Sequence, residues 1–316
     1  MKEELIISGR NLPHIDPHLD LWHWPISLYL FLGGLAAGIL FFAAVVTLFN
    51  KEDKYQGAVK WATIIPPFAL SIGLIALLYD LTHIWYSWRL FTAFRITSPM
   101  SWGAWTLLLI TPISLLWTIS YFKAYFPSWN WQEGLLAILG KLIDYINQHK
   151  KILAWVLIPS TIILGIYTGI LLSAFNARPL WNNSILGPLF LTSGLSTGAA
   201  AIIVLAKSHT ERKLFSMIDL VLIGIELFLI THMIMGMMAG SQVQIEASQL
   251  IMGGEFTVMF WVFVVILGLA FPAILEIFEL IGFKVPAVVP AILVLIGGLV
   301  FRFVMVDAGQ LTRYLY

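Results

Sequence analysis

Hydrophobic residues occur along this chain in long unbroken runs that are separated by short, more polar stretches. Eight runs are long enough to cross a bilayer, whose hydrocarbon core takes about 20 residues of helix. They cover residues 24–49, 58–84, 102–122, 152–174, 185–206, 214–238, 256–279 and 285–305. Strands of a membrane barrel would instead show short alternating runs with frequent turns. The pattern therefore predicts an all-α integral membrane protein with eight transmembrane helices.

Two places make the boundaries of these runs less clear. Pro66 and Pro67 stand inside the second run, but the apolar residues continue to Leu78. Proline lacks a backbone donor and clashes with the preceding turn, so we expect this helix to be kinked rather than ended. The link at 280–284 between the last two runs is short, which predicts that these two helices are close neighbours.

Composition supports the membrane assignment and excludes several functions. Hydrophobic residues make up 59% of the 316 residues and charged residues only 11%, whereas soluble domains are about one quarter charged. The net charge of +1 gives no basic surface for nucleic acid. The chain has no cysteine, which excludes disulfides, covalently attached haem and iron–sulfur clusters in this chain. It also has no dinucleotide-binding or P-loop motif.

Positive charge is distributed unequally between the two sides that eight helices define. Six Lys and Arg residues fall on the side of the termini: Lys2, Arg10, Arg89, Arg95, Arg178 and Arg313. Eleven fall on the opposite side: Lys51, Lys54, Lys60, Lys123, Lys141, Lys150, Lys151, Lys207, Arg212, Lys213 and Lys284. The positive-inside rule predicts that the second side is cytoplasmic and that both termini lie outside, in a prokaryotic cytoplasmic membrane.

A short glycine motif occurs twice, at nearly half the length of the chain. Gly34 and Gly38 in the first run correspond to Gly194 and Gly198 in the fifth. Such small-xxx-small motifs are common at contacts between membrane helices. We interpret the repeat as two tandem four-helix bundles. The predicted parts are an extracytoplasmic segment 1–21, a first bundle formed by 22–150 with 151–174, and a second bundle 175–316.

Polar and aromatic residues gather at the outer ends of the first four helices. The set comprises Trp22, His23, Trp24, Asp80, His83, Ser98, Ser101 and Tyr167. A quinone ring stacks on aromatic side chains, its carbonyl oxygens accept hydrogen bonds, and its reduction needs titratable groups nearby. For the tryptophans alone, the aromatic belt of membrane proteins is the simpler interpretation. Asp80 with His83 is as consistent with a functional site as with a structural one.

A second polar set lies within the last four predicted helices. It comprises Asp219, Glu226, His232, Glu276 and Arg302. An unpaired charge at the bilayer centre costs at least about 2.5–3.5 kcal/mol, so these groups must pair, take up protons or line water. A proton path is one interpretation, and a static Glu226–Arg302 pair is favoured over it. A haem held by His83 and His232 is a less favoured alternative, since isolated membrane histidines are mostly hydrogen-bonded packing residues.

Several short motifs, spread through most of the chain, point to one family of membrane subunits. They are Leu30–Gly38, Asp80-Leu81, Ser98–Gly103, Tyr167–Gly169, Pro179–Trp181, Pro188, Ser193-Gly194, Glu226, Trp261, Gly268, Pro272 and Arg302–Gly309. With them the chain resembles the NrfD-like membrane subunits found in polysulfide reductase and related molybdenum enzymes. The block Ser98–Gly103 is the most specific match. The sequence departs from the family after Leu81, where Thr82-His83 replaces the usual Gly-Arg-Pro.

The resemblance implies a cofactor-free subunit that reacts with menaquinone or ubiquinone in the lipid bilayer. It implies a ferredoxin-like partner with four-iron clusters docked on the outer face, and a molybdopterin catalytic subunit beyond it. His23 falls where the family has a first-helix histidine, and Tyr167 stands in its tyrosine motif. The resemblance therefore places a quinone pocket in the region that the polar residues had already indicated.

We expect a membrane anchor of a respiratory oxidoreductase complex that exchanges electrons between an iron–sulfur partner and the quinone pool, with proton translocation as a further expectation. The first polar set is expected to supply quinone donors (His23, Tyr167), proton exchangers (Asp80, His83), pocket walls (Trp22, Trp24) and a lining residue (Ser98). The second set is expected to form a proton route or a structural pair. No residue is expected to act on the terminal substrate or to bind metal.

Two other functions fit parts of the sequence. Two similar halves with buried carboxylates are also found in proton-coupled transporters and channels without a redox role. Transporters, however, place their broken helices around a midplane site, whereas the first polar set here lies near one face. A purely structural anchor, with the quinone site elsewhere in a complex, is the second alternative.

Overall fold

The computed structural model describes residues 22–314, and the eight predicted membrane helices are all present in it. They are α2 (Trp24–Leu48), η2 to α3 (Gly57–Asp80), α5 (Pro99–Ser120), α8 (Lys150–Ser173), α9 (Leu186–Leu205), α10 (His209–Met238), η5 with α12 (Met259–Ile281) and α13 (Val288–Leu311). No strand occurs among the described residues. The predicted segment 1–21 lies outside the described part of the chain.

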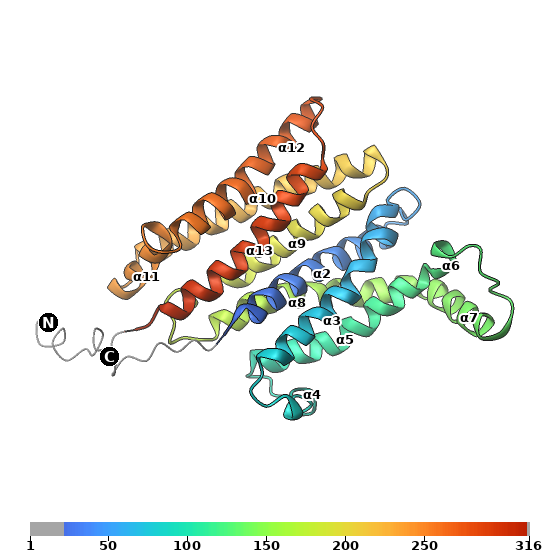
Figure 1. The fold of residues 1–316 in the computed structure, drawn as a ribbon, viewed down its shortest axis with the longest axis horizontal. Coiled ribbons are helices and arrows are strands. Elements are labelled where there is room, and N and C mark those ends of the chain that lie inside the picture. The colour runs from blue at the N-terminus through green and yellow to red at the C-terminus, as the bar shows by residue number, and fades with distance from the viewer. Residues whose placement is uncertain (1–21, 315–316) are drawn as a thin grey trace, which may run out of the picture.

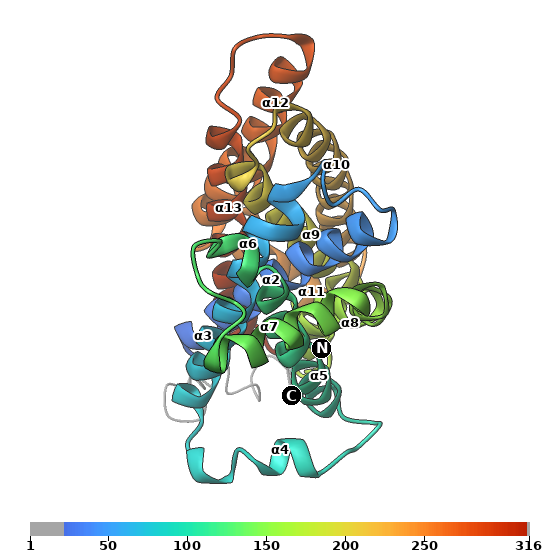
Figure 2. The same cartoon turned by 90° about the vertical axis from the view of Figure 1, so that its right-hand side faces the viewer.

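Shorter helices occupy the connections at the two ends of the helix array (Figures 1 and 2). They are η4 (Ile84–Tyr86), α4 (Arg89–Thr92), α6 (Phe122–Tyr125), α7 (Gly134–Gln148) and α11 (Gln242–Met252). Hydropathy did not predict them, because each is too short or too polar to cross a bilayer. The connection that carries α4 projects from the end where α3 stops and α5 starts.

The second membrane helix is irregular at its start, in the turns that precede its two prolines. A π-helical turn, Gly57–Trp61, and a 3₁₀ turn, Ala62–Ile64, precede the regular part of α3. Pro66 and Pro67 cannot donate to the carbonyl groups of this preceding turn, so the distortion falls there and the span continues to Asp80.

Some helix ends differ from the hydrophobic runs. The run 58–84 predicted a helix through His83, but the helix ends at Asp80 and Leu81 is extended. His83 therefore lies in the connection between α3 and α5, just before η4, rather than at the end of α3. The run 285–305 stops too early, because α13 continues to Leu311. In the last turn of α13, the side-chain amide of Gln310 accepts a hydrogen bond from the backbone N–H of Trp22 and donates one to its carbonyl, both at 2.7 Å. These two bonds satisfy a polar side chain in this part of the helix.

The repeated glycine motif forms the central helix contact. A β-carbon on Gly38 would lie 2.1 Å from the carbonyl oxygen of Gly194, and one on Gly198 would lie 2.6 Å from the Cα of Gly38. The backbones of α2 and α9 therefore touch along the motif, as small-xxx-small contacts do. Figure 1 shows α2 and α9 in the middle of the array, with α3 and α8 near the first and α10 and α13 near the second.

Buried apolar residues from both halves form one continuous core. The motif contact between α2 and α9 lies within it, and α13 packs against both helices. The halves thus share a packed boundary in the described structure. Their origin as two tandem four-helix bundles stays a prediction.

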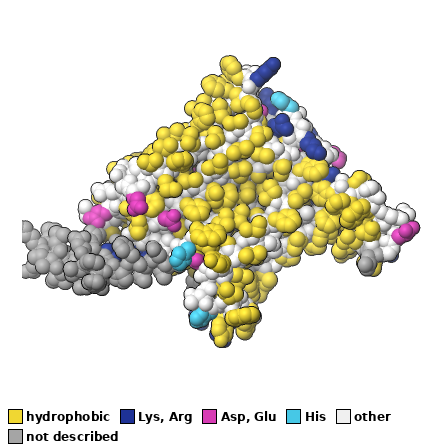
Figure 3. All heavy atoms as spheres, in the orientation of Figure 1, with side chains coloured by type: hydrophobic (Ala, Val, Ile, Leu, Met, Phe, Trp, Pro, Cys, Tyr) yellow, Lys and Arg dark blue, Asp and Glu magenta, His cyan; other side chains and the backbone are white. Residues whose placement is uncertain are grey.

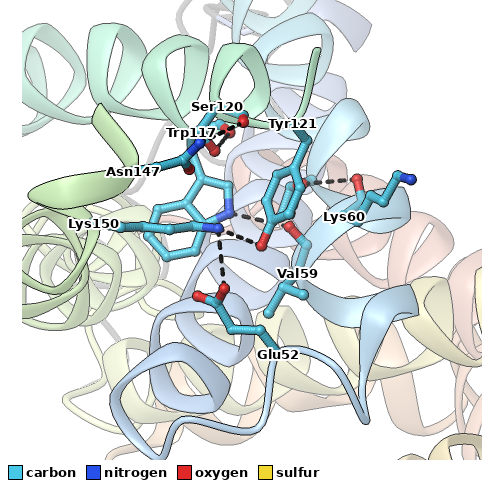
Figure 4. A network of polar contacts seen from close by, with 9 residues as sticks. Glu52, Val59, Lys60, Trp117, Ser120, Tyr121, Asn147 and Lys150 are labelled. Atoms are coloured by element: carbon cyan, nitrogen blue, oxygen red, sulfur yellow. Dashed lines mark hydrogen bonds and ion pairs between the residues drawn. The ribbon is translucent and has the colours of Figure 1, made fainter. Parts of the chain in front are cut away.

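A polar network joins the connections at the end of the array opposite Trp22 (Figure 4). The ammonium group of Lys150 is buried, lies 3.4 Å from a carboxylate oxygen of Glu52 and donates to the hydroxyl of Tyr121. It also lies 3.6 Å from the centre of the Tyr121 ring. Burial first, and then the nearby Glu52 carboxylate, raise the pKa of Tyr121, so its hydroxyl remains protonated. The network holds the connection between α2 and η2, which carries Glu52, against α5 and α8.

Charged side chains lie mainly at the margins of a broad hydrophobic surface. Figure 3 shows most of the visible Lys and Arg side chains gathered at the upper right together with His, whereas Asp and Glu side chains appear on both the left and the right of the view. The broad apolar surface between them is the part that faces lipid. The protein is a multi-pass membrane protein, and the orientation that the positive-inside rule gives it stays a prediction.

Candidate functional site

His23 and Asp80 form a direct pair at the ends of α2 and α3. The Nδ1 atom of His23 lies 3.0 Å from Oδ1 of Asp80. The Asp80 side chain is 9% exposed, whereas that of His23 is 62% exposed. The pair arises because α3 ends at Asp80 beside the start of α2. A largely buried carboxylate can hold the imidazole in one orientation and can take part in proton transfer with it.

The structure therefore gives Asp80 a different partner from the one the sequence suggested. The hypothesis paired Asp80 with His83, which is only three residues further on. The helix has already ended there, and the His83 ring lies near Tyr86, 6.3 Å away between ring centres. His23 takes the position beside the carboxylate instead.

An open cavity of about 440 Å³ adjoins the His23–Asp80 pair. Its lining is formed by His23, Trp24, Pro25, Tyr79, Asp80, Leu81 and Thr82. The rings of Trp24 and Tyr79 lie 6.3 Å apart between centres. The cavity thus offers an imidazole and a carboxylate beside two aromatic rings, which suits a flat ligand that exchanges protons.

Tyr167 lines a second cavity, of about 270 Å³, between α5 and α8. Its lining is formed by Ile96, Thr97, Pro99, Trp102, Ile163, Ile166, Tyr167 and Ile170. Most of these side chains are apolar, and the side-chain groups that can donate a hydrogen bond are the hydroxyls of Tyr167 and Thr97 and the indole of Trp102. A lipophilic ring with a carbonyl oxygen fits such a lining.

Gly103 explains how the tyrosine reaches this position. A β-carbon on Gly103 would lie 1.9 Å from Cζ and 2.3 Å from the hydroxyl oxygen of Tyr167. The phenol ring therefore lies directly on the backbone of α5. The motif Ser98–Gly103 and the motif around Tyr167, far apart in sequence, form one contact.

The rest of the motif Ser98–Gly103 shapes the approach to this cavity. Ser98 precedes the first turn of α5, and its side chain makes no capping bond. Ser101 instead accepts from the backbone N–H of Arg95 at 3.0 Å and donates to the carbonyl of Ala93 at 3.1 Å. The Trp102 indole donates to the carbonyl of Ile96 at 2.6 Å. Ser98 is flanked by two lining residues but does not line the cavity itself.

Trp22 packs between the two halves of the chain rather than along the His23 cavity. Its ring lies 4.9 Å from that of Phe175 and 5.1 Å from that of Trp181. The Trp181 indole donates to the carbonyl of Met305 at 2.7 Å. Trp22 thus belongs to an aromatic cluster that connects the start of the first helix to α13.

The second polar set contains two adjacent buried carboxyl groups. Asp219 on α10 and Glu276 on α12 are both fully buried and act on each other electrostatically. The hydroxyl of Ser196 donates to Oδ1 of Asp219 at 2.6 Å. The other Asp219 oxygen and both Glu276 oxygens have no hydrogen-bond donor among the described residues. A proton shared between the two carboxyl groups would give two of these three oxygens a partner.

Arg302 is buried without a direct ion pair to Glu226 in the described part of the chain. Its guanidinium donates to the Ser193 hydroxyl at 2.8 Å and to the carbonyl of Phe190 at 3.2 Å. It also lies 4.4 Å from the centre of the Phe190 ring. Glu226 is near enough to interact with the charge. The static pair expected from sequence is therefore replaced by a guanidinium held mainly by α9.

His232 lies apart from the other members of the second set. It is exposed on α10 and its ring stacks on that of Phe228, 5.9 Å away. Asp219, Glu226, Glu276 and Arg302 are all buried. The structure thus brings four of the five residues into the interior and leaves His232 on the outside.

Sequence reasoning missed three residues that the structure places in important contacts. Tyr29 is buried beside Tyr167, but within an apolar run it reads as an ordinary core residue. Glu211 is 1% exposed and accepts from the backbone N–H groups of Gly57 and Ala58 at 3.1 and 2.9 Å. Gln310 holds Trp22. The sequence signal for Gln310 was that this polar residue follows the last apolar run.

No group of three or more His, Asp or Glu side chains in the described residues could hold a metal ion.

Comparison with known proteins gives matches over nearly the whole length of the sequence. Residues 14–313 match the family described as "Polysulphide reductase, NrfD". The protein is 33% identical over 307 residues to "Protein NrfD" of Escherichia coli (strain K12), a match that covers 92% of this sequence and 96% of that protein. It is 32% identical over 304 residues to the C subunit of polysulfide reductase from Wolinella succinogenes, covering 92% and 94%. It is 30% identical over 322 residues to a "Protein NrfD homolog" of Haemophilus influenzae, covering 95% and 98%.

Proposed function

The chain belongs to the NrfD family, and from this premise we propose that it is the membrane anchor of a respiratory oxidoreductase complex that exchanges electrons with the quinone pool. Menaquinone or ubiquinone is its lipid-soluble substrate. The observation that carries the proposal is the Tyr167 cavity, where a buried phenol faces an otherwise mostly apolar space between α5 and α8. A quinone headgroup needs such a combination of apolar walls and a few oriented donors.

The roles of individual residues follow from their positions. Tyr167 donates to a carbonyl oxygen, and Trp102 with the isoleucines of the cavity excludes water from it. His23 with Asp80 exchanges protons at the outer surface, because this pair is open to solvent on the histidine side and buried on the carboxylate side. Quinone chemistry needs two electrons and two protons, and this chain supplies groups for the protons only. Trp24 is a wall of the His23 cavity.

The electrons must come from, or go to, another subunit. The chain has no cysteine, so it cannot ligate an iron–sulfur cluster of the usual kind. We propose a ferredoxin-like subunit with four-iron clusters on the outer face, connected to a molybdopterin catalytic subunit. A relative that is itself named as one lettered subunit of polysulfide reductase supports membership of a multi-subunit reductase. Both termini lie on this outer side of the prokaryotic cytoplasmic membrane in our proposal.

The acidic residues of the second half support proton translocation as an additional role. Three carboxylate oxygens of Asp219 and Glu276 lack donors among the described residues, and ionised carboxylates in this position would be costly. We propose that Asp219 and Glu276 carry an exchangeable proton between Glu226 and the cytoplasmic side. Glu276→Gln should lower proton uptake per electron in proteoliposomes and leave electron exchange intact. Unchanged proton uptake would assign the carboxyl pair a structural role.

Purification of the protein from its own membranes in mild detergent tests the proposed function. We expect an iron–sulfur subunit and a molybdopterin subunit to co-purify and to be identified by mass spectrometry. Within that complex, Tyr167→Phe and His23→Ala should each lower quinone-linked turnover. Recovery of the protein alone under several gentle conditions, with ion or solute uptake by vesicles that contain it, would instead support the transporter alternative.

A further inference from the structure

Tyr29 has a buried hydroxyl group that makes no hydrogen bond of regular geometry to any described residue. The side chain lies on α2 and is 3% exposed, and its hydroxyl oxygen is unpartnered among the described residues. Buried tyrosine hydroxyls usually have a partner. Inside a membrane, water is not available to replace it. The position therefore calls for an explanation beyond core packing.

The packing around Tyr29 places its hydroxyl next to Tyr167. On one side the ring lies against α3, because a β-carbon on Gly73 would be 3.3 Å from Cδ2 of Tyr29. The Tyr29 and Tyr167 hydroxyls are near enough to act on each other. The Tyr167 ring lies on Gly103 and lines the cavity, whereas Tyr29 does not line it. Tyr29 is thus a second phenol beside the first, away from the cavity wall.

The same two helices carry the His23–Asp80 pair closer to the surface. Asp80 and Gly73 are seven residues apart and share a face of α3, and His23 precedes Tyr29 on α2. Tyr29 therefore lies between the two helices that carry the His23–Asp80 pair, and its hydroxyl is next to that of Tyr167.

We propose that Tyr29 is a positioning residue for the quinone site. Its hydroxyl donates to the Tyr167 oxygen, so that the Tyr167 proton is held toward the cavity. A phenol has one proton and can accept as well as donate, so a hydrogen bond received from Tyr29 directs the only proton of Tyr167 to the ligand. The inference rests on the proposed role of Tyr167 as a donor to the quinone.

Tyr29→Phe in the assembled complex removes the hydroxyl alone and tests the inference. Binding of a water-soluble naphthoquinone to the resting complex should weaken about tenfold, the effect of one lost hydrogen bond. Tyr29→Phe combined with Tyr167→Phe should bind no more weakly than Tyr167→Phe alone, because both changes remove the same directed donor. Thr47→Val is the matched control. Thr47 also has a buried hydroxyl that is unpartnered among the described residues, but it lies at the other end of α2.

The outcomes separate this inference from the proposed function. Binding in Tyr29→Phe equal to that of the unmodified complex, with binding lost in Tyr167→Phe, overturns the role of Tyr29 alone. Binding unchanged in both variants overturns the quinone site and the role of Tyr29 with it. If Tyr29→Phe does not assemble, Tyr29→Leu removes the hydroxyl with a smaller apolar side chain. Weakened binding in Tyr29→Leu then supports the inference, and unchanged binding overturns it.

Discussion

At the residue scale, the candidate site depends on the contact between Tyr167 and Gly103 more than on any charged group. The phenol ring occupies the volume that any larger side chain at position 103 would need. The cavity on its other side is lined mostly by apolar side chains. A single methyl group at Gly103 therefore tests whether the position of the ring matters for function.

Gly103→Ala should displace the Tyr167 ring and reduce quinone-linked turnover by more than tenfold, because misplacement of a donor by about 1 Å can cost 10²-fold. Steady-state kinetics of the assembled complex, with the KM for quinone, measures the effect. Gly236→Ala is the control, since a β-carbon at Gly236 has no atom within 4 Å. Equal kinetics for the two variants would show that the ring position is unimportant.

The sequence predicted the residues of this site better than it predicted their contacts. His23, Asp80 and Tyr167 were identified from polarity and motif, and the first two are in direct contact. Asp80 contacts His23 rather than His83, because the helix ends at Asp80 and hydropathy does not reveal this end; the proposed proton-exchange role of His83 stays a prediction. Tyr29 was missed because an apolar run does not show whether the hydroxyl of a tyrosine within it will find a hydrogen-bond partner.

At the scale of the elements, the contact between α2 and α9 determines how the two halves meet. An added β-carbon would lie 2.1 Å from the backbone of the other motif at Gly38 and 2.5 Å from it at Gly198, so a larger side chain at either position would separate the helices. The sequence showed the repeat but not that its two copies touch each other, because small-xxx-small motifs also form contacts with other helices. The eight spans were predictable because lipid requires continuous apolar helices.

Gly38→Ala should destabilise the protein by about 1–3 kcal/mol or more, the usual cost of overpacking, because its β-carbon would lie 2.1 Å from the carbonyl oxygen of Gly194. Thermal unfolding of the purified protein in detergent measures the change. Gly224→Ala, in open space on α10, should leave stability equal or slightly higher, since alanine favours helix more than glycine does. Equal melting temperatures for Gly38→Ala and Gly224→Ala would contradict the close contact.

At the scale of the whole molecule, the functional groups are distributed unevenly across the membrane. The His23–Asp80 pair lies at the end with the Trp22–Gln310 contact, and the Lys150 network lies at the opposite end. Lys and Arg gather at that opposite end as well (Figure 3). Count and distribution of charge allowed the orientation to be predicted from sequence, whereas the Lys150–Tyr121–Glu52 network depends on tertiary contacts that sequence does not show.

The absence of cysteine in the sequence allows this orientation to be tested with single substitutions. Trp85→Cys, at a residue 90% exposed in the outer connection, should react with a membrane-impermeant thiol reagent in intact spheroplasts. Lys54→Cys, in the first connection at the other end, should react only after the membrane is opened. The reverse pattern of labelling would place the quinone-proximal end in the cytoplasm and would remove the proposed outer docking of the iron–sulfur subunit.

The central claim is that this protein exchanges electrons between a partner's clusters and quinone through the site around Tyr167 and His23. The most direct measurement is the rate of cluster oxidation or reduction in the purified complex after quinone or quinol is added, followed by electron paramagnetic resonance. We predict fast exchange in the unmodified complex and slow exchange in Tyr167→Phe and His23→Ala, with dithionite reducing the clusters equally in all three. Equal rates of quinone-dependent exchange in all three complexes would contradict the claim.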